Sequence, residues 1–405
     1  MIAGRRKVVN QNALLMFWSL LASACSSSGT NSDHTAVRDS AGVRIVENSL
    51  EALSSAPEWR LSPTPTLQLG ELDAADPYTL FDVTGAAQVN GLLWILNRGT
   101  SELRAYSLDG THAFSTGREG EGPGEFISPL NLIVLAPDTL VIWDFRTHRV
   151  SYLGPDGSFL RSVSVLGNFT NPELVTVFED GSFLFSDPSP FVPTTGGIEE
   201  SPIHVVRFGS DGTPMDSLGV FPGGQVKKID GPPGYTFVAF SPTTRVAGGR
   251  TTFWVGTGEA LEVEERNAFG EVVRIVRWQV MDRSVRQEDV DAFRSVQLGS
   301  GEGESLPDPL RRMIEEAPVA DRFPALDRLI VDRVGRVWVR RFRRPTEKEA
   351  DEWIIFDSVG TLIARIHTPL DLQVYDIRED YVVGKTKGDF DEEYIRRFEL
   401  IREER

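Results

Sequence analysis

Short runs of alternating hydrophobic and polar positions follow one another along most of the chain. The segments 92–96 and 140–143 are examples, and such runs are typical of half-buried β-strands. Pairs such as Asp109-Gly110 and Asp156-Gly157 separate the runs, and they accept the positive φ angles of tight hairpin turns. The pattern therefore predicts successive antiparallel hairpins. The first two units are expected at 85–89, 92–98, 102–108 and 111–116, and at 130–136, 139–145, 149–154 and 158–166.

The units repeat along the chain. Four short strands recur roughly every 40 to 50 residues, which is the pattern of a propeller blade. Later units start near residues 173, 243, 327 and 372. The last unit has only three strands before the chain ends, whereas the segment 59–70 precedes the first unit without a partner. The sequence therefore predicts an all-β, six-bladed β-propeller over residues 59–405, in which 59–70 completes the last blade and leaves no open edge.

One segment departs from the β pattern. Ser284-x-x-Gln287 can cap a helix that continues to Val296. Leu310, Met313, Ile314 and Ala317 then follow at helical spacing. We expect a helical insert at 282–324, between the fourth and fifth blades.

The first residues have the organisation of an export signal. Arg5, Arg6 and Lys7 precede an apolar run of about a dozen residues, which is too short to span a bilayer. Small residues then lead to Cys25, and the segment 21–25 resembles a bacterial lipobox. We expect a signal peptide at 1–24 and a lipid anchor on Cys25. The lipid anchor and the tether that follows it are expected to occupy residues 25–58. The alternative is an ordinary signal peptide cut near Ala24.

A second resemblance covers most of the chain. Gly124-x-Phe126-x-x-Pro129, followed by Trp143-Asp144 and Arg149-Val150, is similar to NHL-type repeats. Taken whole, the chain resembles the six-bladed β-propeller lipoproteins of environmental bacteria. The resemblance implies an exported location in the bacterial cell envelope but no settled activity. Ser26, in place of Asp, implies sorting of the lipoprotein to the outer membrane.

Charge restricts the partners. Removal of residues 1–24 takes away three cations and no anions, so the net charge changes from −17 to −20. A chain this acidic is not expected to bind nucleic acid, which requires a clustered positive surface. We expect a monomer that meets the membrane through Cys25, with a protein or a small anionic ligand as its partner. Cys25 is the only cysteine, so no internal disulfide can form.

Catalytic motifs are absent from the sequence. The five histidines form no His-Glu-x-x-His motif, and no Gly-x-Ser-x-Gly motif occurs. The glycine-rich stretch 117–124 precedes a strand and carries glutamates, so a connector between blades is favoured over a phosphate loop. We therefore expect a binding protein with no cofactor or metal rather than an enzyme. The alternative is a lyase or lactonase-like enzyme with a metal such as calcium in the central channel.

The lengths of the connections between strands suggest which face of the propeller binds a ligand. The turns between strands one and two and between three and four are short, whereas every long connection opens on the opposite face. Long loops on a rigid scaffold often carry function. The residues predicted to bind a ligand there are Arg118, Arg146, Tyr235, Arg341 and Arg343. For the last two, pairing with nearby acidic residues such as Glu347 is the alternative.

Overall fold

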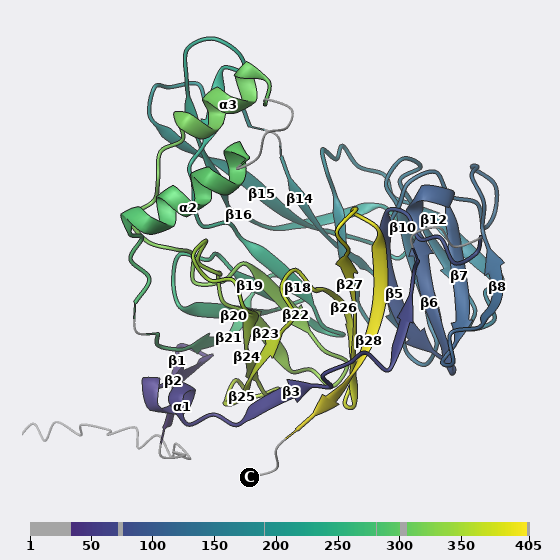
Figure 1. Cartoon of the computed structure of the whole chain (residues 1–405). Helices are drawn as coiled ribbons and strands as arrows, with labels where there is room; N and C mark the ends of the chain where they lie inside the picture. Colours follow the sequence, from purple (N-terminus) through teal and green to yellow (C-terminus); the bar gives the residue numbers. More distant parts are fainter. Residues whose placement is uncertain (1–33, 72–75, 190, 281, 300–305, 403–405) are drawn as a thin grey trace, which may run out of the picture.

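The computed structural model describes residues 34–71, 76–189, 191–280, 282–299 and 306–402. The signal segment 1–24 and Cys25 lie outside this part. β-Strands make up about half of the described chain, far more than helices do (Figure 1). The first two repeats each form one antiparallel four-stranded sheet in chain order. Their strands lie within two residues of the predicted positions: β5 (Val83–Val89), β6 (Leu92–Asn97), β7 (Glu102–Ser107), β8 (His112–Thr116), β9 (Pro129–Leu135), β10 (Thr139–Asp144), β11 (Arg149–Leu153) and β12 (Phe159–Ser164).

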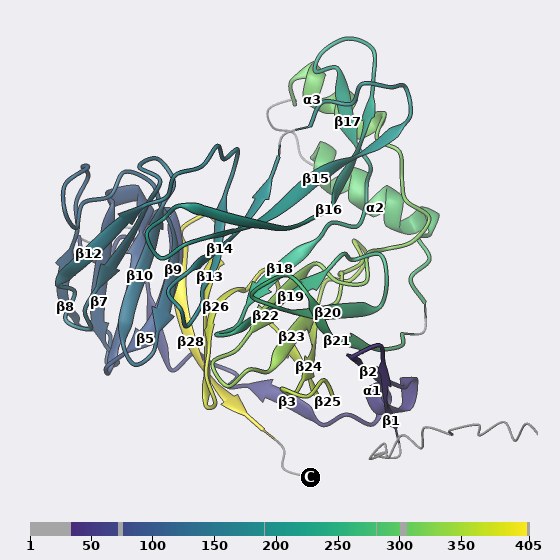
Figure 2. The ribbon, with the colours of Figure 1, turned by 180° about the vertical axis from the view of Figure 1, so that it is seen from behind.

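The later strands follow the same meander. They are β13 (Glu173–Val177), β14 (Phe183–Pro188), β15 (Ile198–Phe208), β16 (Pro214–Lys228) and β17 (Tyr235–Phe237), then β18 (Arg245–Gly248), β19 (Thr252–Gly256), β20 (Glu262–Asn267) and β21 (Val272–Arg277), then β22 (Arg328–Val331), β23 (Val337–Arg340), β24 (Asp351–Phe356) and β25 (Leu362–Thr368), and finally β26 (Gln373–Ile377), β27 (Tyr381–Lys387) and β28 (Glu393–Ile401). β15 and β16 form a long hairpin that extends away from the other sheets toward the helices (Figures 1 and 2).

The innermost strands of successive repeats are neighbours around a central cavity. β5 contacts β9, β9 contacts β13, β13 contacts β18, and β18 contacts β22. β26 then contacts β5, so that the C-terminal strands return to the first sheet (Figures 1 and 2). The cores lie between adjacent sheets and contain fully buried aromatic side chains, among them Trp94, Trp143 and Trp338. The arrangement is that of a β-propeller-like fold.

The N-terminal segment is built into the outer edges of these sheets. β1 (Thr35–Ser40) and β2 (Val43–Asn48) form a hairpin in which β2 pairs in parallel with β21. After the short helix α1 (Leu50–Ser54), β3 (Glu58–Leu61) pairs with both β25 and β28, and β4 (Leu67–Leu69) pairs with β28. The pairing of β3 and β4 with β28 agrees with the expected role of 59–70.

Residues 34–58 differ from the tether predicted for 25–58. The buried Asn48 side chain donates to the Arg277 and Gly360 carbonyl oxygens and accepts from the Leu362 N–H, at 2.9–3.1 Å. These hydrogen bonds tie β2 to strands more than 200 residues away. Their partners are distant in sequence, so a local pattern gives no sign of them.

The turn between the third and fourth strands packs against the preceding sheet. Gly212 has φ +80°, and a Cβ placed there would lie 2.1 Å from the Ser164 carbonyl oxygen of β12. Gly157 has φ +76°, and its Cβ would lie 3.0 Å from Trp94. Glycine is therefore required at these turns both by backbone conformation and by close approach of the neighbouring sheet.

Two helices lie in the predicted insert segment. They are α2 (Gln287–Leu298) and α3 (Asp308–Glu315), between β21 and β22. The predicted cap at Ser284 is wrong, because α2 begins at Gln287 and the Asp289 carboxylate accepts a hydrogen bond from the Arg286 N–H at 3.0 Å. Ser284 instead forms an isolated β-bridge with Arg322. Among the described helices, none is long and apolar enough to cross a membrane.

Candidate ligand-binding cavity

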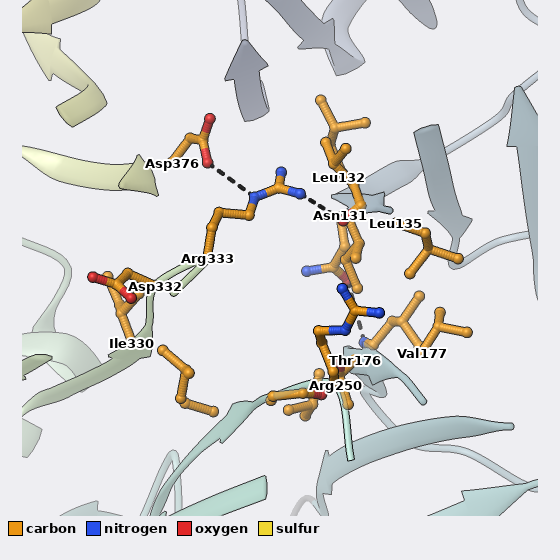
Figure 3. A pocket seen from close by; sticks show the side chains of 18 of the residues that line it. Asn131, Leu132, Leu135, Thr176, Val177, Arg250, Ile330, Asp332, Arg333 and Asp376 are labelled. Atoms are coloured by element: carbon orange, nitrogen blue, oxygen red, sulfur yellow. Dashed lines mark hydrogen bonds and ion pairs between the residues drawn. The ribbon is translucent and has the colours of Figure 1, made fainter. Parts of the chain in front are cut away.

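A cavity of about 1240 Å³ occupies the centre of the ring. Residues of the innermost strands β5, β9, β13, β18, β22 and β26 line it, together with the turns that follow several of them. Leu132, Val177 and Ile330 contribute apolar side chains, and Arg250, Arg333 and Asp376 contribute charged ones (Figure 3). A cavity this large, lined by apolar, polar and charged side chains, is suited to an organic ligand.

The end of the cavity at which the innermost strands begin is called the long-loop end here, because the long connections lie there. Arg328, the first residue of β22, is partly buried in this part of the cavity wall. Its Nη2 lies 3.5 Å from the Val374 carbonyl oxygen, and no carboxylate of the described residues forms an ion pair with it. Burial lowers the pKa of Arg328, repulsion from Arg340 lowers it further, and Glu173 opposes the shift.

Arg245, the first residue of β18, belongs to the same electrostatic neighbourhood. Its Nε donates to the Asp327 carbonyl oxygen at 2.7 Å. Desolvation lowers the pKa of Arg245, while Asp327 and Glu173 raise it. The Arg245 residue is exposed, whereas Arg328 is partly buried in the cavity wall.

The opposite end, where the innermost strands finish, is called the short-turn end. Arg333 lies in the turn after β22, and its Nη1 donates to the Val134 carbonyl oxygen at the end of β9 at 2.7 Å. Its Nε lies 3.4 Å from Asp376 Oδ1 of β26 (Figure 3). Asp376 also meets Arg378 at 3.4 Å, so one carboxylate serves two guanidinium groups. Arg250 pairs with Glu179 at 2.8 Å.

A buried aspartate fixes two connections at the long-loop end. Asp144, the last residue of β10, is fully buried and accepts four backbone hydrogen bonds. Its Oδ2 accepts from Ile127 and Ser128 at 2.6 and 3.1 Å, and its Oδ1 accepts from Arg146 and Thr147 at 3.0 and 3.1 Å. The Trp143-Asp144 pair of the NHL-like motif therefore has a structural role: Asp144 holds the 117–128 loop and the β10–β11 turn together.

The glycine-rich loop folds around a carboxylate of its own. Glu125 accepts from the Gly122 N–H at 2.8 Å and pairs with the exposed Arg118. Phe126 next to it is fully buried. The loop connects β8 to β9, which agrees with the prediction of a connector.

The predicted binding residues lie outside the cavity lining. Arg118 and Arg146 are exposed on the two connections that Asp144 holds. Tyr235 begins β17, whose partner in the sheet is the end of β16, and α3 contacts this strand. Arg341 pairs with Glu347 and Glu352, and Arg343 pairs with Asp351 and Asp371. The structure thus brings Arg118 and Arg146 onto neighbouring connections but leaves Tyr235 apart from them.

The cavity arginines were missed in the sequence. The available signal was an arginine at the first position of an inner strand, as in Arg328, or in the turn that follows, as in Arg333. A single sequence does not reveal that these positions converge, because the strands lie in different repeats. No described residue of the helical insert lines the cavity.

The described residues contain no group of three or more His, Cys, Asp or Glu side chains placed to hold a metal ion. His148, in the β10–β11 turn, has φ +47°, and its ring stacks on Trp143 with centroids 6.0 Å apart. Its contacts are those of a packing residue.

Comparisons with known proteins give distant structural matches. No family model matches the sequence. No curated protein matches it either. A member of the DUF4221 family from Bacteroides vulgatus is 10% identical, with a TM-score of 0.49 over 86% of this chain and 100% of that one. A Bacteroides fragilis protein described as exported is 14% identical, with a TM-score of 0.47 over 86% and 99%. Virginiamycin B lyase from Staphylococcus aureus is 10% identical, with a TM-score of 0.38 over 85% and 94%.

Proposed function

We propose that this chain is an exported, lipid-anchored, six-bladed β-propeller that binds a small anionic ligand in its central cavity. The count of six blades is supported by the innermost strands β5, β9, β13, β18, β22 and β26, all of which contribute to the cavity lining. In this proposal 59–70 closes the last blade and 282–324 is a helical insert between the fourth and fifth. The proposal also places the chain with the six-bladed propeller lipoproteins that its NHL-like motif resembles.

The location is proposed from the first residues of the chain. Arg5, Arg6 and Lys7, the short apolar run and Cys25 are typical of an exported lipoprotein. The mature protein then begins at Cys25 in the bacterial cell envelope, and Ser26 favours the outer membrane. Cell fractionation of Cys25→Ser tests this: we expect the variant to leave the membrane fraction, and unchanged membrane retention would contradict the anchor.

The observation that carries the binding proposal is the state of Arg328. Its guanidinium carries five N–H donors, and among the described residues it makes one hydrogen bond, at 3.5 Å, to a backbone carbonyl. A desolvated cation without an ionic partner is energetically unfavourable, and an anionic ligand group would satisfy it. Because the Arg328 guanidinium is a cation, a carboxylate or phosphate is favoured over a neutral group.

The test is a thermal-shift and calorimetric titration of the mature protein with octanoate, glucuronate and phosphate, with glucose as the uncharged control. At least one anion should bind, and Arg328→Gln should weaken that binding about tenfold or more, because a charge-assisted hydrogen bond is lost. Arg311→Gln is the matched control, because Arg311 lies on α3 and pairs with Glu315 at the surface. Binding that survives Arg328→Gln unchanged, or no binding of any anion, would contradict the proposal.

A further inference from the structure

The two ends of the cavity carry arginines that one strand connects. Arg328 begins β22, and Arg333 lies in the turn directly after this strand. From Arg328 to Val331 the strand covers about 10 Å, at about 3.3 Å per residue. Both residues line the cavity. Arg328 therefore marks its long-loop end and Arg333 its short-turn end.

Arg333 is held in place but retains donors. Starting from β22, its guanidinium reaches Val134 on β9 and Asp376 on β26, so the side chain extends across the cavity (Figure 3). These contacts use the Nη1 and Nε atoms, and both are fixed in direction. A guanidinium has five N–H donors in one plane, which leaves donors for a further acceptor. Burial lowers the pKa of Arg333, and Asp376 only partly opposes the shift.

The wall between the two arginines mixes apolar side chains with uncharged polar ones such as Asn131 and Thr176. Leu132, Val177 and Ile330 project into this stretch, and Leu135 lies near its short-turn end (Figure 3). A hydrocarbon chain releases water when it packs against the apolar side chains of this wall, and those side chains offer no partner for a charge. The charged groups of a ligand would therefore be placed at the ends of the cavity rather than in its middle.

We propose that the cavity takes an elongated dianion, with one anionic group at Arg328, the other at Arg333, and an apolar or uncharged spacer between them. This inference rests on the proposed binding function. It assigns Arg333 as a second binding residue and sets the distance between the two charges. A short dianion cannot reach both ends, and a monoanion of the same length leaves Arg333 without a ligand partner.

The experiment uses dicarboxylates as probes. Isothermal titration of the mature protein compares azelate and sebacate with nonanoate, which has the same kind of chain but one carboxylate, and with succinate, which is too short. We expect azelate or sebacate to bind about tenfold more tightly than nonanoate or succinate. Arg333→Gln should remove this advantage while nonanoate affinity stays unchanged, and Arg311→Gln should change neither.

The outcomes separate the inference from the function on which it rests. If nonanoate binds in an Arg328-dependent manner and the dicarboxylates show no advantage, the elongated dianion is wrong and the binding function stands. If the dicarboxylates are preferred but Arg333→Gln keeps that preference, the second anionic site is not at Arg333. If none of the probes or the earlier anions binds, the binding function itself fails. Arg333→Lys keeps the charge and serves as the folding control, since it should retain most of the dicarboxylate preference.

Discussion

Asp144 offers the sharpest test of how the long-loop end is held together. Its carboxylate accepts four backbone N–H groups, two from the end of the 117–128 loop and two from the β10–β11 turn. Asp144→Asn preserves the shape of the side chain but replaces one acceptor oxygen with an NH₂ donor. Two of the four N–H groups then face a donor instead of an acceptor.

The expected cost follows from these contacts. A hydrogen bond to a charged group contributes about 1.5–3 kcal/mol, so two lost bonds amount to roughly 3–6 kcal/mol before relaxation. Small movements of the two connections will recover part of this, and we expect the free energy of unfolding to fall by about 3 kcal/mol. Asp144→Ala removes all four bonds and should cost more.

Urea unfolding followed by tryptophan fluorescence measures the change, and hydrogen exchange locates it. The amides of Ile127 and Ser128 should lose protection in Asp144→Asn. The control is Asp138→Asn, in the neighbouring β9–β10 turn, whose carboxylate makes no hydrogen bond with the described residues; it should change stability by about 0.5 kcal/mol or less. If Asp144→Asn is no more destabilising than this control, or if both amides stay protected, the assigned role of Asp144 is wrong.

Three further changes have defined expectations. Gly212→Ala should cost about 1–3 kcal/mol more than Gly91→Ala, because both have positive φ but only Gly212 would place its Cβ against a neighbouring carbonyl; equal costs would contradict the close approach. Glu173→Gln should tighten the binding of a carboxylate at Arg328 roughly threefold, because it removes a negative charge near that site, and weaker binding would contradict this placement. Burial raises the pKa of Tyr106 to about 12, against about 10 when unfolded, so its contribution to stability is complete below pH ~10 and is lost as the pH rises toward 12. Unfolding at several alkaline pH values should show this loss, and Tyr106→Phe should make the pH dependence shallower.

Sequence alone was sufficient for the repeat and for the strands of its first two units. Strand limits depend on a local pattern, in which side chains alternate between two faces and glycine follows aspartate in the turns. The repeats built from 83–116 and 129–164 were therefore placed within two residues of their observed limits. The absence of catalytic motifs and the acidic charge could likewise be read from the chain.

The pairing of the N-terminal strands could not be predicted from the local sequence pattern. The parallel pairing of β2 with β21 joins residues about 230 positions apart. Asn48 adds hydrogen bonds to the last residue of β21, to the β24–β25 turn and to the first residue of β25. Strand pairing depends on backbone groups that every residue carries, so the sequence of β2 does not name its partner. For this reason the segment 34–58 was assigned to the tether.

The cavity was decided by tertiary structure alone. Loop length favours the long-loop face and with it Arg118 and Arg341, but the structure places both beside carboxylates of the same chain. Arg328 and Arg333 lie on or next to a short strand that gives no local sign of function, and they reach the centre of the ring because the innermost strands converge there. Sequence determined which segments of the repeats become strands. The closure of those strands into a ring determined which arginine side chains are desolvated without a carboxylate of their own. Such desolvation depends on residues that are far apart in the chain.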